Sequence, residues 1–201
     1  MGTAVAETRR VIPLHPGRAA HATGKVGMIL FLASWAMMFG ALFYSYGILR
    51  ARAPIWPPAG APETPIVVPA IITVLIIVSS ILLEQGRTAL RLGKTTQFHR
   101  LMIGTMVLGA LFIALQSQVW VDLWAAGLQL NTGRYGSLFY FLTFFHAIHV
   151  VVGLGLLGWS FWTAPRLDSP IASYARAQYA AWFWHFVAVV WLIVFTLVYV
   201  Y

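Results

Sequence analysis

Five long apolar segments, separated by short polar connections, dominate the sequence and limit what the chain can fold into. They cover residues 26–49, 66–83, 101–121, 136–162 and 179–201. Each has at least the roughly 17 residues that a helix needs to cross the hydrocarbon core of a bilayer. The chain is 60% hydrophobic and only 9% charged, which is outside the usual range for soluble domains. The sequence therefore predicts an all-α integral membrane bundle of five transmembrane helices.

The distribution of lysine and arginine predicts how this bundle is oriented. Of the 13 basic residues, all but Arg50, Arg52 and Arg134 lie in the N-terminal tail, the second connection or the fourth connection. Basic residues favour the cytoplasmic side of a membrane, so we expect the N-terminus in the cytoplasm and the C-terminus outside. Residues 1–25 are expected to form a flexible basic cytoplasmic tail, and residues 26–201 the transmembrane domain. The net charge of +8 forms no basic face, which argues against a nucleic-acid partner.

The stretch "FFHAIHVVVG" places His146 and His149 three residues apart in the fourth apolar segment. Residues with this spacing share one face of a helix, and His185 in the fifth segment could approach them. Three histidines can form a metal site, but neither segment contains Asp or Glu to complete a ligand set or orient an imidazole. We therefore favour an interhelical polar cluster of His146, His149, His185 and Gln116. A self-contained membrane haem or metal protein that uses the three histidines is the alternative of a different class.

The five acidic residues place no carboxylate deep within an apolar segment. Glu84 and Asp122 lie at the ends of the second and third segments, where we expect water to reach them. A relay of carboxylates through this chain alone is therefore not expected, because ionisable groups inside a span are the usual parts of such a relay.

Four stretches of the sequence carry a family resemblance. They read "GMILFLASWAMMFGALFYSYGILR", "WPPAGAPETP", "YGSLFYFLTFFHAIHVVVG" and "WHFVAVVWLIVFTLVYVY", and the serine pair Ser79 and Ser80 follows the second stretch. In order and spacing, from about Met28 to the C-terminus, they resemble the subunit III family of haem-copper oxidases. The number of apolar segments matches the short, five-helix bacterial form of this family.

The resemblance implies a non-catalytic accessory subunit of a cytochrome c or quinol oxidase in the inner (plasma) membrane of a bacterium. In this family subunit I carries the haems and the copper, so no cofactor is expected in this chain. The expected partners are subunit I, subunit II, a small subunit IV and membrane lipids. The resemblance further implies that the chain stabilises subunit I, binds phospholipid and supports aerobic electron transport coupled to proton pumping. A related accessory subunit of nitric oxide reductases has similar motifs and is the alternative within this class.

Three positions depart from the family pattern, which has acidic residues there: Trp35, Val119 and Ala188. We interpret these departures as the replacement of a buried network of acids and histidines by apolar packing. Apolar replacement of a whole buried ionic set can be neutral or stabilising.

Arginines that flank the cytoplasmic ends of the segments are candidates to bind lipid head groups, because a basic side chain near an anionic membrane surface contributes about 1 kcal/mol. These candidates are Arg87, Arg91, Arg100, Arg166 and Arg176.

Overall fold

Five long α-helices make up the fold in the computed structural model, which describes residues 16–164 and 170–200. They are α1 (Pro16–Ala51), α2 (Val67–Arg91), α3 (Thr95–Ala125), α4 (Arg134–Thr163) and α5 (Pro170–Phe195), and a π-helical turn, η2 (Thr196–Val200), continues α5. All five helices are long and apolar enough to cross a membrane. The predicted all-α, five-span architecture is therefore confirmed.

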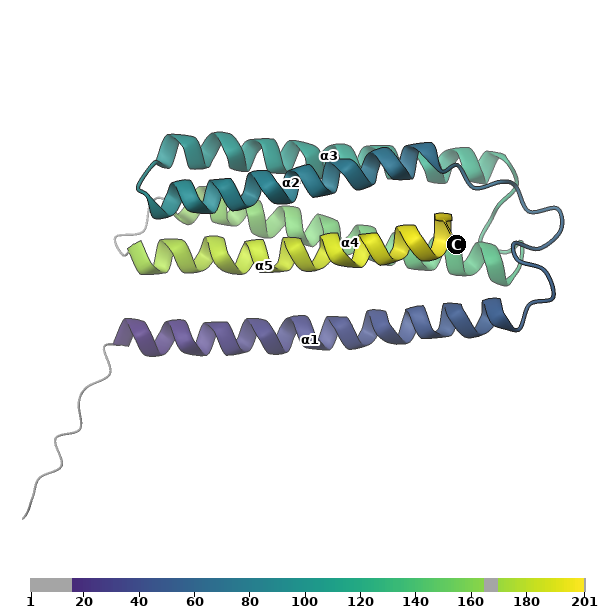
Figure 1. Ribbon diagram of the computed structural model, residues 1–201, viewed down its shortest axis with the longest axis horizontal. Coiled ribbons are helices and arrows are strands. Elements are labelled where there is room, and N and C mark those ends of the chain that lie inside the picture. Colours follow the sequence, from purple (N-terminus) through teal and green to yellow (C-terminus); the bar gives the residue numbers. More distant parts are fainter. Residues whose placement is uncertain (1–15, 165–169, 201) are drawn as a thin grey trace, which may run out of the picture.

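The helices lie side by side and alternate in direction along the bundle (Figure 1). Helices α2 and α3 form a closely packed pair, and α5 contacts α1, α2 and α4. Helix α1 is the least enclosed: among its described side chains, only those of Phe39 and Tyr46 are buried. The core of the bundle is therefore built by α2 to α5, and α1 lies against one side of it.

The helices extend beyond the apolar segments from which they were predicted. Helix α1 begins at Pro16 rather than at residue 26, so the tail expected over residues 1–25 contributes its last part to a helix. Helix α2 continues to Arg91 because residues such as glutamate, glutamine and arginine favour helix although they end the apolar run. Two residues beyond its end lies Gly93, whose φ of 73° is a left-handed conformation that glycine adopts without strain. Residues 1–15 lie outside the described part of the chain.

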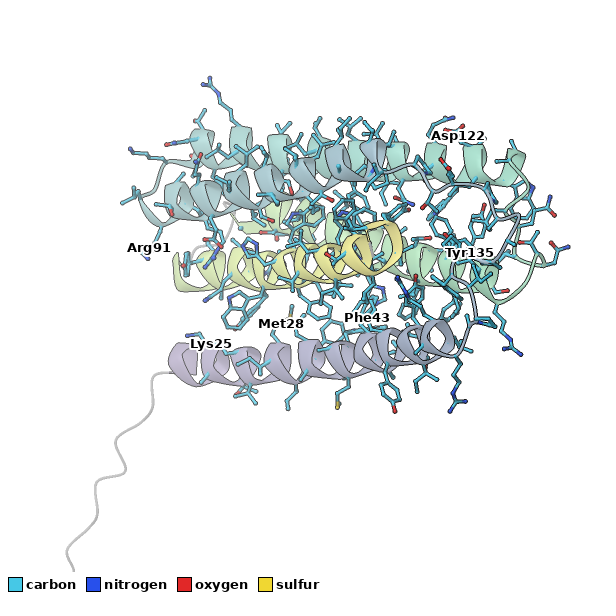
Figure 2. All side chains as sticks on the ribbon, turned by 45° about the vertical axis from the view of Figure 1, so that its right-hand side comes forward. Lys25, Met28, Phe43, Arg91, Asp122 and Tyr135 are labelled. Atoms are coloured by element: carbon cyan, nitrogen blue, oxygen red, sulfur yellow. The ribbon has the colours of Figure 1, made fainter. Side chains whose placement is uncertain are left out.

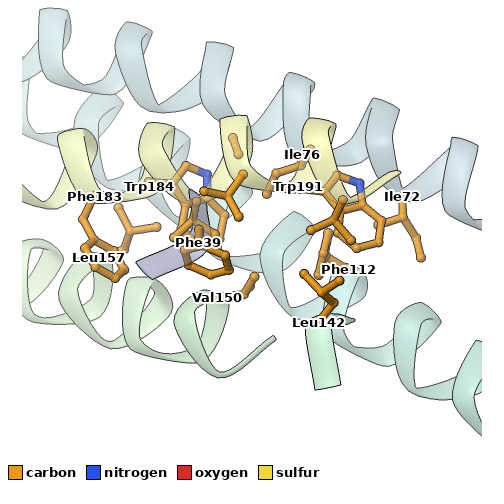
Figure 3. Packing of buried hydrophobic residues seen from close by; sticks show 14 of the residues in the cluster. Phe39, Ile72, Ile76, Phe112, Leu142, Val150, Leu157, Phe183, Trp184 and Trp191 are labelled. Atoms are coloured by element: carbon orange, nitrogen blue, oxygen red, sulfur yellow. The ribbon is translucent and has the colours of Figure 1, made fainter. Parts of the chain in front are cut away.

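Two tryptophans of α5, Trp184 and Trp191, lie at the centre of the core, and both are fully buried (Figure 3). The ring of Phe112 on α3 meets Trp191 edge to face, with ring centroids 4.7 Å apart. Gly109 on α3 and Gly153 on α4 leave room for Trp184, because a Cβ atom at these positions would come within 2.5 Å and 3.0 Å of its indole ring. Close packing of this kind is a main source of helix association in membranes.

The two ends of the bundle carry different charges. Lys25 and Arg91 lie at the end where α2 passes into α3, whereas Asp122 and Tyr135 lie towards the opposite end (Figure 2). We call the first the basic end of the bundle.

Candidate functional site

Four hydrogen bonds between side chains join α2 and α5. The one from Arg87 to Tyr174 lies nearest to the basic end, and the other three lie further from it. These three pairs are Trp191 Nε1 with Thr73 Oγ1 (2.9 Å), Trp184 Nε1 with Ser79 Oγ (3.0 Å) and His185 Nε2 with Glu84 Oε1 (2.8 Å). Together they fix the register of the two helices over most of the length of α2. Interhelical hydrogen bonds in membranes contribute about 0.6 to 2 kcal/mol each.

Glu84 is the centre of the polar contacts nearest to the basic end. Its Oε1 atom accepts hydrogen bonds from Arg87 Nη1 at 2.5 Å and from His185 Nε2 at 2.8 Å. Arg87 Nη2 in turn donates to the hydroxyl of Tyr174 on α5, at 3.0 Å. The Arg87 side chain is only 11% exposed, so this guanidinium is enclosed by protein groups. The acid, the imidazole and the guanidinium thus form a charged cluster between α2 and α5.

The expectation that Glu84 lies at a wetted end of a span stays a prediction, and its side chain is 49% exposed in this cluster. Helix α2 continues about two turns past Glu84, to Arg91, so the acid does not end the helix. The sequence indicated one contact of this cluster. Glu84 and Arg87 are three residues apart, so they would pair if the helix continued past Glu84. The partner His185 was not predictable from this spacing, since it comes from another helix.

His146 on α4 is fully buried in an aromatic environment. Its ring centroid lies 5.3 Å from that of Trp191, 5.7 Å from Phe112 and 6.5 Å from Phe39. Within the described part of the chain, neither ring nitrogen has a hydrogen-bond partner. The predicted interhelical hydrogen bond of His146 is therefore not formed among these residues, and the ring acts as a packing element.

His149 also packs among aromatic rings, and its Nδ1 donates to the carbonyl oxygen of Phe145 in its own helix at 2.7 Å. The edge of its ring meets Trp35 of α1, with centroids 4.3 Å apart and planes at 81°. Trp35 is one of the three positions that lack the acid of the family pattern. At this position an indole ring contacts the histidine.

Gln116 on α3 is fully buried and donates from Nε2 to the hydroxyl of Tyr199, in the turn η2, at 3.0 Å. Its Oε1 atom has no partner among the described residues. Gln116 thus connects α3 to the end of α5.

The four side chains predicted as one polar cluster therefore have different partners. His146 and His149 share a face of α4, whereas His185 bonds to Glu84 on α2 and Gln116 bonds to Tyr199. Across residues 16–164 and 170–200, no three histidine, aspartate or glutamate side chains are grouped as a metal site would require.

The other two departures from the family pattern lie in different surroundings. Val119 on α3 is buried, with 1% of its surface exposed. Ala188 on α5 is 8% exposed and lines a groove between α2 and α5.

The arginines predicted to bind lipid fall into two groups. Arg91 and Arg100 are exposed. Arg87 is occupied by Glu84 and Tyr174, and the Arg176 guanidinium lies 5.0 Å from the ring centroid of Trp159. Arg166 lies outside the described residues.

The five apolar helices and the hydrogen bonds between them define the chain as an α-helical, multi-pass membrane protein. The sequence model of the family described as cytochrome c oxidase subunit III matches residues 15–201. The chain belongs to this family, whose members are subunits of a larger oxidase complex.

Individual relatives agree with this assignment. The cytochrome c oxidase subunit 3 of Synechocystis sp. is 34% identical over 178 residues, which cover 86% of this chain and 73% of the relative. The subunit 3 of Thermostichus vulcanus is also 34% identical, over 87% of this chain and 86% of the relative. That of the fish Polypterus ornatipinnis is 32% identical, over 87% of this chain and 68% of the relative.

Proposed function

We propose that the chain is the non-catalytic subunit III of a respiratory haem-copper terminal oxidase in a bacterial inner membrane. The observation that carries this proposal is the family match, which runs from residue 15 to the C-terminus and includes all five membrane helices. In this role the chain packs against subunit I and stabilises it, and it supports aerobic electron transport coupled to proton pumping.

The haems and the copper belong to subunit I in this proposal, and subunit II and a small subunit IV complete the complex. The surroundings of the α4 histidines support the assignment of the haems and the copper to subunit I. His146 is enclosed by the rings of Phe39, Phe112 and Trp191, and His149 is in contact with Trp35 and its own helix. These rings occupy the space in which an axial ligand would need its haem.

Phospholipid binding is the second part of the proposed role. Arg91 and Arg100 are exposed near the basic end, where anionic head groups of the cytoplasmic leaflet would meet them if the N-terminus is cytoplasmic. Arg87 and Arg176 contact protein groups instead, so we assign the electrostatic part of lipid binding to the exposed arginines.

The departures at Trp35, Val119 and Ala188 are part of the same proposal. We infer that the acidic network of other family members is replaced here by packing. The contact between Trp35 and His149 supports this inference, because the indole occupies a place beside the imidazole where a carboxylate would otherwise bond.

The proposal is tested by isolating the chain's partners. The chain carries an affinity tag at its N-terminus, the membranes are dissolved in mild detergent, and the proteins retained with it are identified by mass spectrometry. We expect subunits I and II of a haem-copper oxidase and the absorption bands of haem in the complex. Recovery of a nitric oxide reductase instead would establish the alternative accessory role. Haem or metal bound to the chain free of any partner would contradict a non-catalytic subunit.

A further inference from the structure

Two fully buried polar side chains, Gln116 on α3 and His146 on α4, lie in the layer of the bundle around Trp191. Each of the two residues has 0% of its surface exposed. Among the residues that the structure describes, the Oε1 atom of Gln116 and both ring nitrogens of His146 have no hydrogen-bond partner. Buried polar groups in folded proteins are nearly always paired, because an unpaired group has given up its bonds to water and gained none in return. These atoms therefore call for a further partner.

The contacts between α3 and α4 place the two side chains at the same level of the bundle. Trp120 on α3 donates a hydrogen bond to Thr143 on α4, and Phe112 on α3 meets the ring of His146, with centroids 5.7 Å apart. Gln116 lies one turn from Phe112 and one turn from Trp120, so the three share a face of α3. Gln116 therefore falls opposite the part of α4 that contains Thr143 and His146.

Helix α5 and the turn η2 close the same layer. The hydroxyl of Tyr199 accepts from Gln116 Nε2 at 3.0 Å, and the centroid of its ring lies 6.2 Å from that of Trp191. The ring of Trp191 lies in turn 5.3 Å from that of His146. Phe112, beside Trp191 in Figure 3, completes the surroundings of both polar groups. The amide and the imidazole are thus enclosed by the same aromatic side chains.

The burial of both groups argues against a partner from another molecule of the complex. A side chain of a second protein would have to reach residues with no exposed surface. The result does not depend on how the Gln116 amide is assigned, because turning it exchanges the two atoms and leaves Nε2 unpaired instead of Oε1. Water is the smallest molecule that can both donate and accept hydrogen bonds, so it can meet either atom.

We propose that this layer binds a water molecule, which accepts a hydrogen bond from the ring nitrogen of His146 that carries the hydrogen and donates one to Gln116 Oε1. Buried waters typically make two to four bonds to groups that are otherwise unpaired. The nitrogen that carries the hydrogen is the one bonded, because an unpaired buried donor is rarer than an unpaired acceptor. The other nitrogen keeps a lone pair only.

The bound water changes what Gln116 does in the fold. Through Nε2 this side chain bonds to Tyr199 at the end of α5, and through Oε1 and the water it is joined to His146 on α4. One amide on α3 thus links three helices. The site lies wholly within this chain, so the proposal does not rest on the proposed function.

The direct test is a structure of the complex, purified through a tag on this chain, by electron cryo-microscopy at a resolution that shows ordered water molecules. We expect a density peak within hydrogen-bond distance of both Gln116 and a ring nitrogen of His146. His149 provides an internal reference, because its Nδ1 is already bonded to the carbonyl oxygen of Phe145 and should show no such peak. Well-resolved side chains with no peak between them, or a direct bond between Gln116 and His146, would overturn the proposal.

A double-variant cycle tests the link without a structure. In the parent chain, His146→Leu removes the ring and the water together and leaves Gln116 Oε1 unpaired, so it should lower the temperature at which the complex dissociates by about 2 °C. In the Gln116→Leu background the imidazole has already lost the water, and the same His146→Leu should raise this temperature. The matched control is His149→Leu, which should have the same effect in both backgrounds. Equal effects of His146→Leu in the two backgrounds would show that no water connects the side chains.

Discussion

The carboxylate of Glu84 on α2 accepts a hydrogen bond from His185 on α5, with 2.8 Å between Oε1 and Nε2. The same oxygen also accepts from Arg87, which is almost enclosed by protein. Glu84 thus neutralises the guanidinium of Arg87 in its own helix. It also joins α2 to α5, because its partner His185 lies 101 positions away in the sequence. Within this cluster, the Glu84 carboxylate is the group that bonds to both His185 and Arg87.

Replacement of Glu84 should therefore be more damaging than joint replacement of the acid and the base. We expect Glu84→Leu to reduce the stability of the chain in the complex by about 1–2 kcal/mol, because it leaves Arg87 without its anionic partner. The double variant Glu84→Leu/Arg87→Leu should recover most of this loss. The measurement is the fraction of the chain retained in the complex after heating in mild detergent, with exposed Arg91→Leu as the control. A double variant as unstable as the sum of both single variants would contradict this account.

His146 offers a test of whether the histidine acts by packing or by hydrogen bonding. Because neither ring nitrogen has a partner in the described structure, His146→Leu should change stability by less than about 1 kcal/mol. His146→Ala should cost about 2–4 kcal/mol, since it leaves a cavity between Phe39, Phe112 and Trp191. Thermal dissociation of the complex measures both effects. A loss of several kcal/mol in His146→Leu would show that the imidazole has a bonding partner in the assembled complex.

The sequence was sufficient to predict the five spans because each is an uninterrupted apolar run of sufficient length. It was not sufficient for their ends, since Glu84, Gln85 and Arg87 end the apolar run but favour helix, and α2 continues to Arg91. Hydropathy reports only the part of a helix that meets hydrocarbon.

The partners of the histidines could not be predicted from the sequence for a geometrical reason. His146 and His149 share a face because they belong to one helix, and this follows from their spacing. The direction of His185 depends on how α5 is turned, and the burial of Trp184 and Trp191 decides this. His185 follows Trp184 by one residue, about 100° around the helix, and so points towards α2 rather than towards α4. Large aromatic side chains thus set the position of the smaller polar ones.

Gly109 should be intolerant of even one added methyl group. A Cβ atom at this position would lie 2.5 Å from Trp184 Cη2 and 2.8 Å from Leu154 Cδ2, so Gly109→Ala should separate α3 from α5 and cost about 1–3 kcal/mol. Gly40→Ala on α1 is the matched control, because nothing lies within 4 Å of the added Cβ and alanine favours helix by up to about 1 kcal/mol. Both variants are compared by thermal dissociation. Equal stability of the two would indicate that Trp184 moves without cost.

The buried bond between Gln116 and Tyr199 predicts non-additive substitutions. Tyr199→Phe removes the hydroxyl that accepts from Gln116 Nε2, and leaves a buried amide whose Oε1 already lacks a partner in the described structure. We expect a loss of about 1–3 kcal/mol. Adding Gln116→Leu to this variant should restore stability, because both polar groups are then removed together. A double-variant cycle measured by thermal dissociation provides the coupling, and a coupling near zero would show that the bond has no energetic role.

The proposed orientation is open to a direct test because the chain has no cysteine of its own. Thr96, at the start of α3 near the basic end, and Asn131, in the connection between α3 and α4 at the opposite end, are both exposed. The excess of lysine and arginine at the basic end predicts that this end faces the cytoplasm. A maleimide that does not cross membranes should therefore label Asn131→Cys in intact spheroplasts and label Thr96→Cys only after the membrane is made permeable. Labelling of Thr96→Cys in intact spheroplasts would reverse the topology, and Arg91 and Arg100 would then lie too far from the anionic cytoplasmic leaflet to bind its head groups.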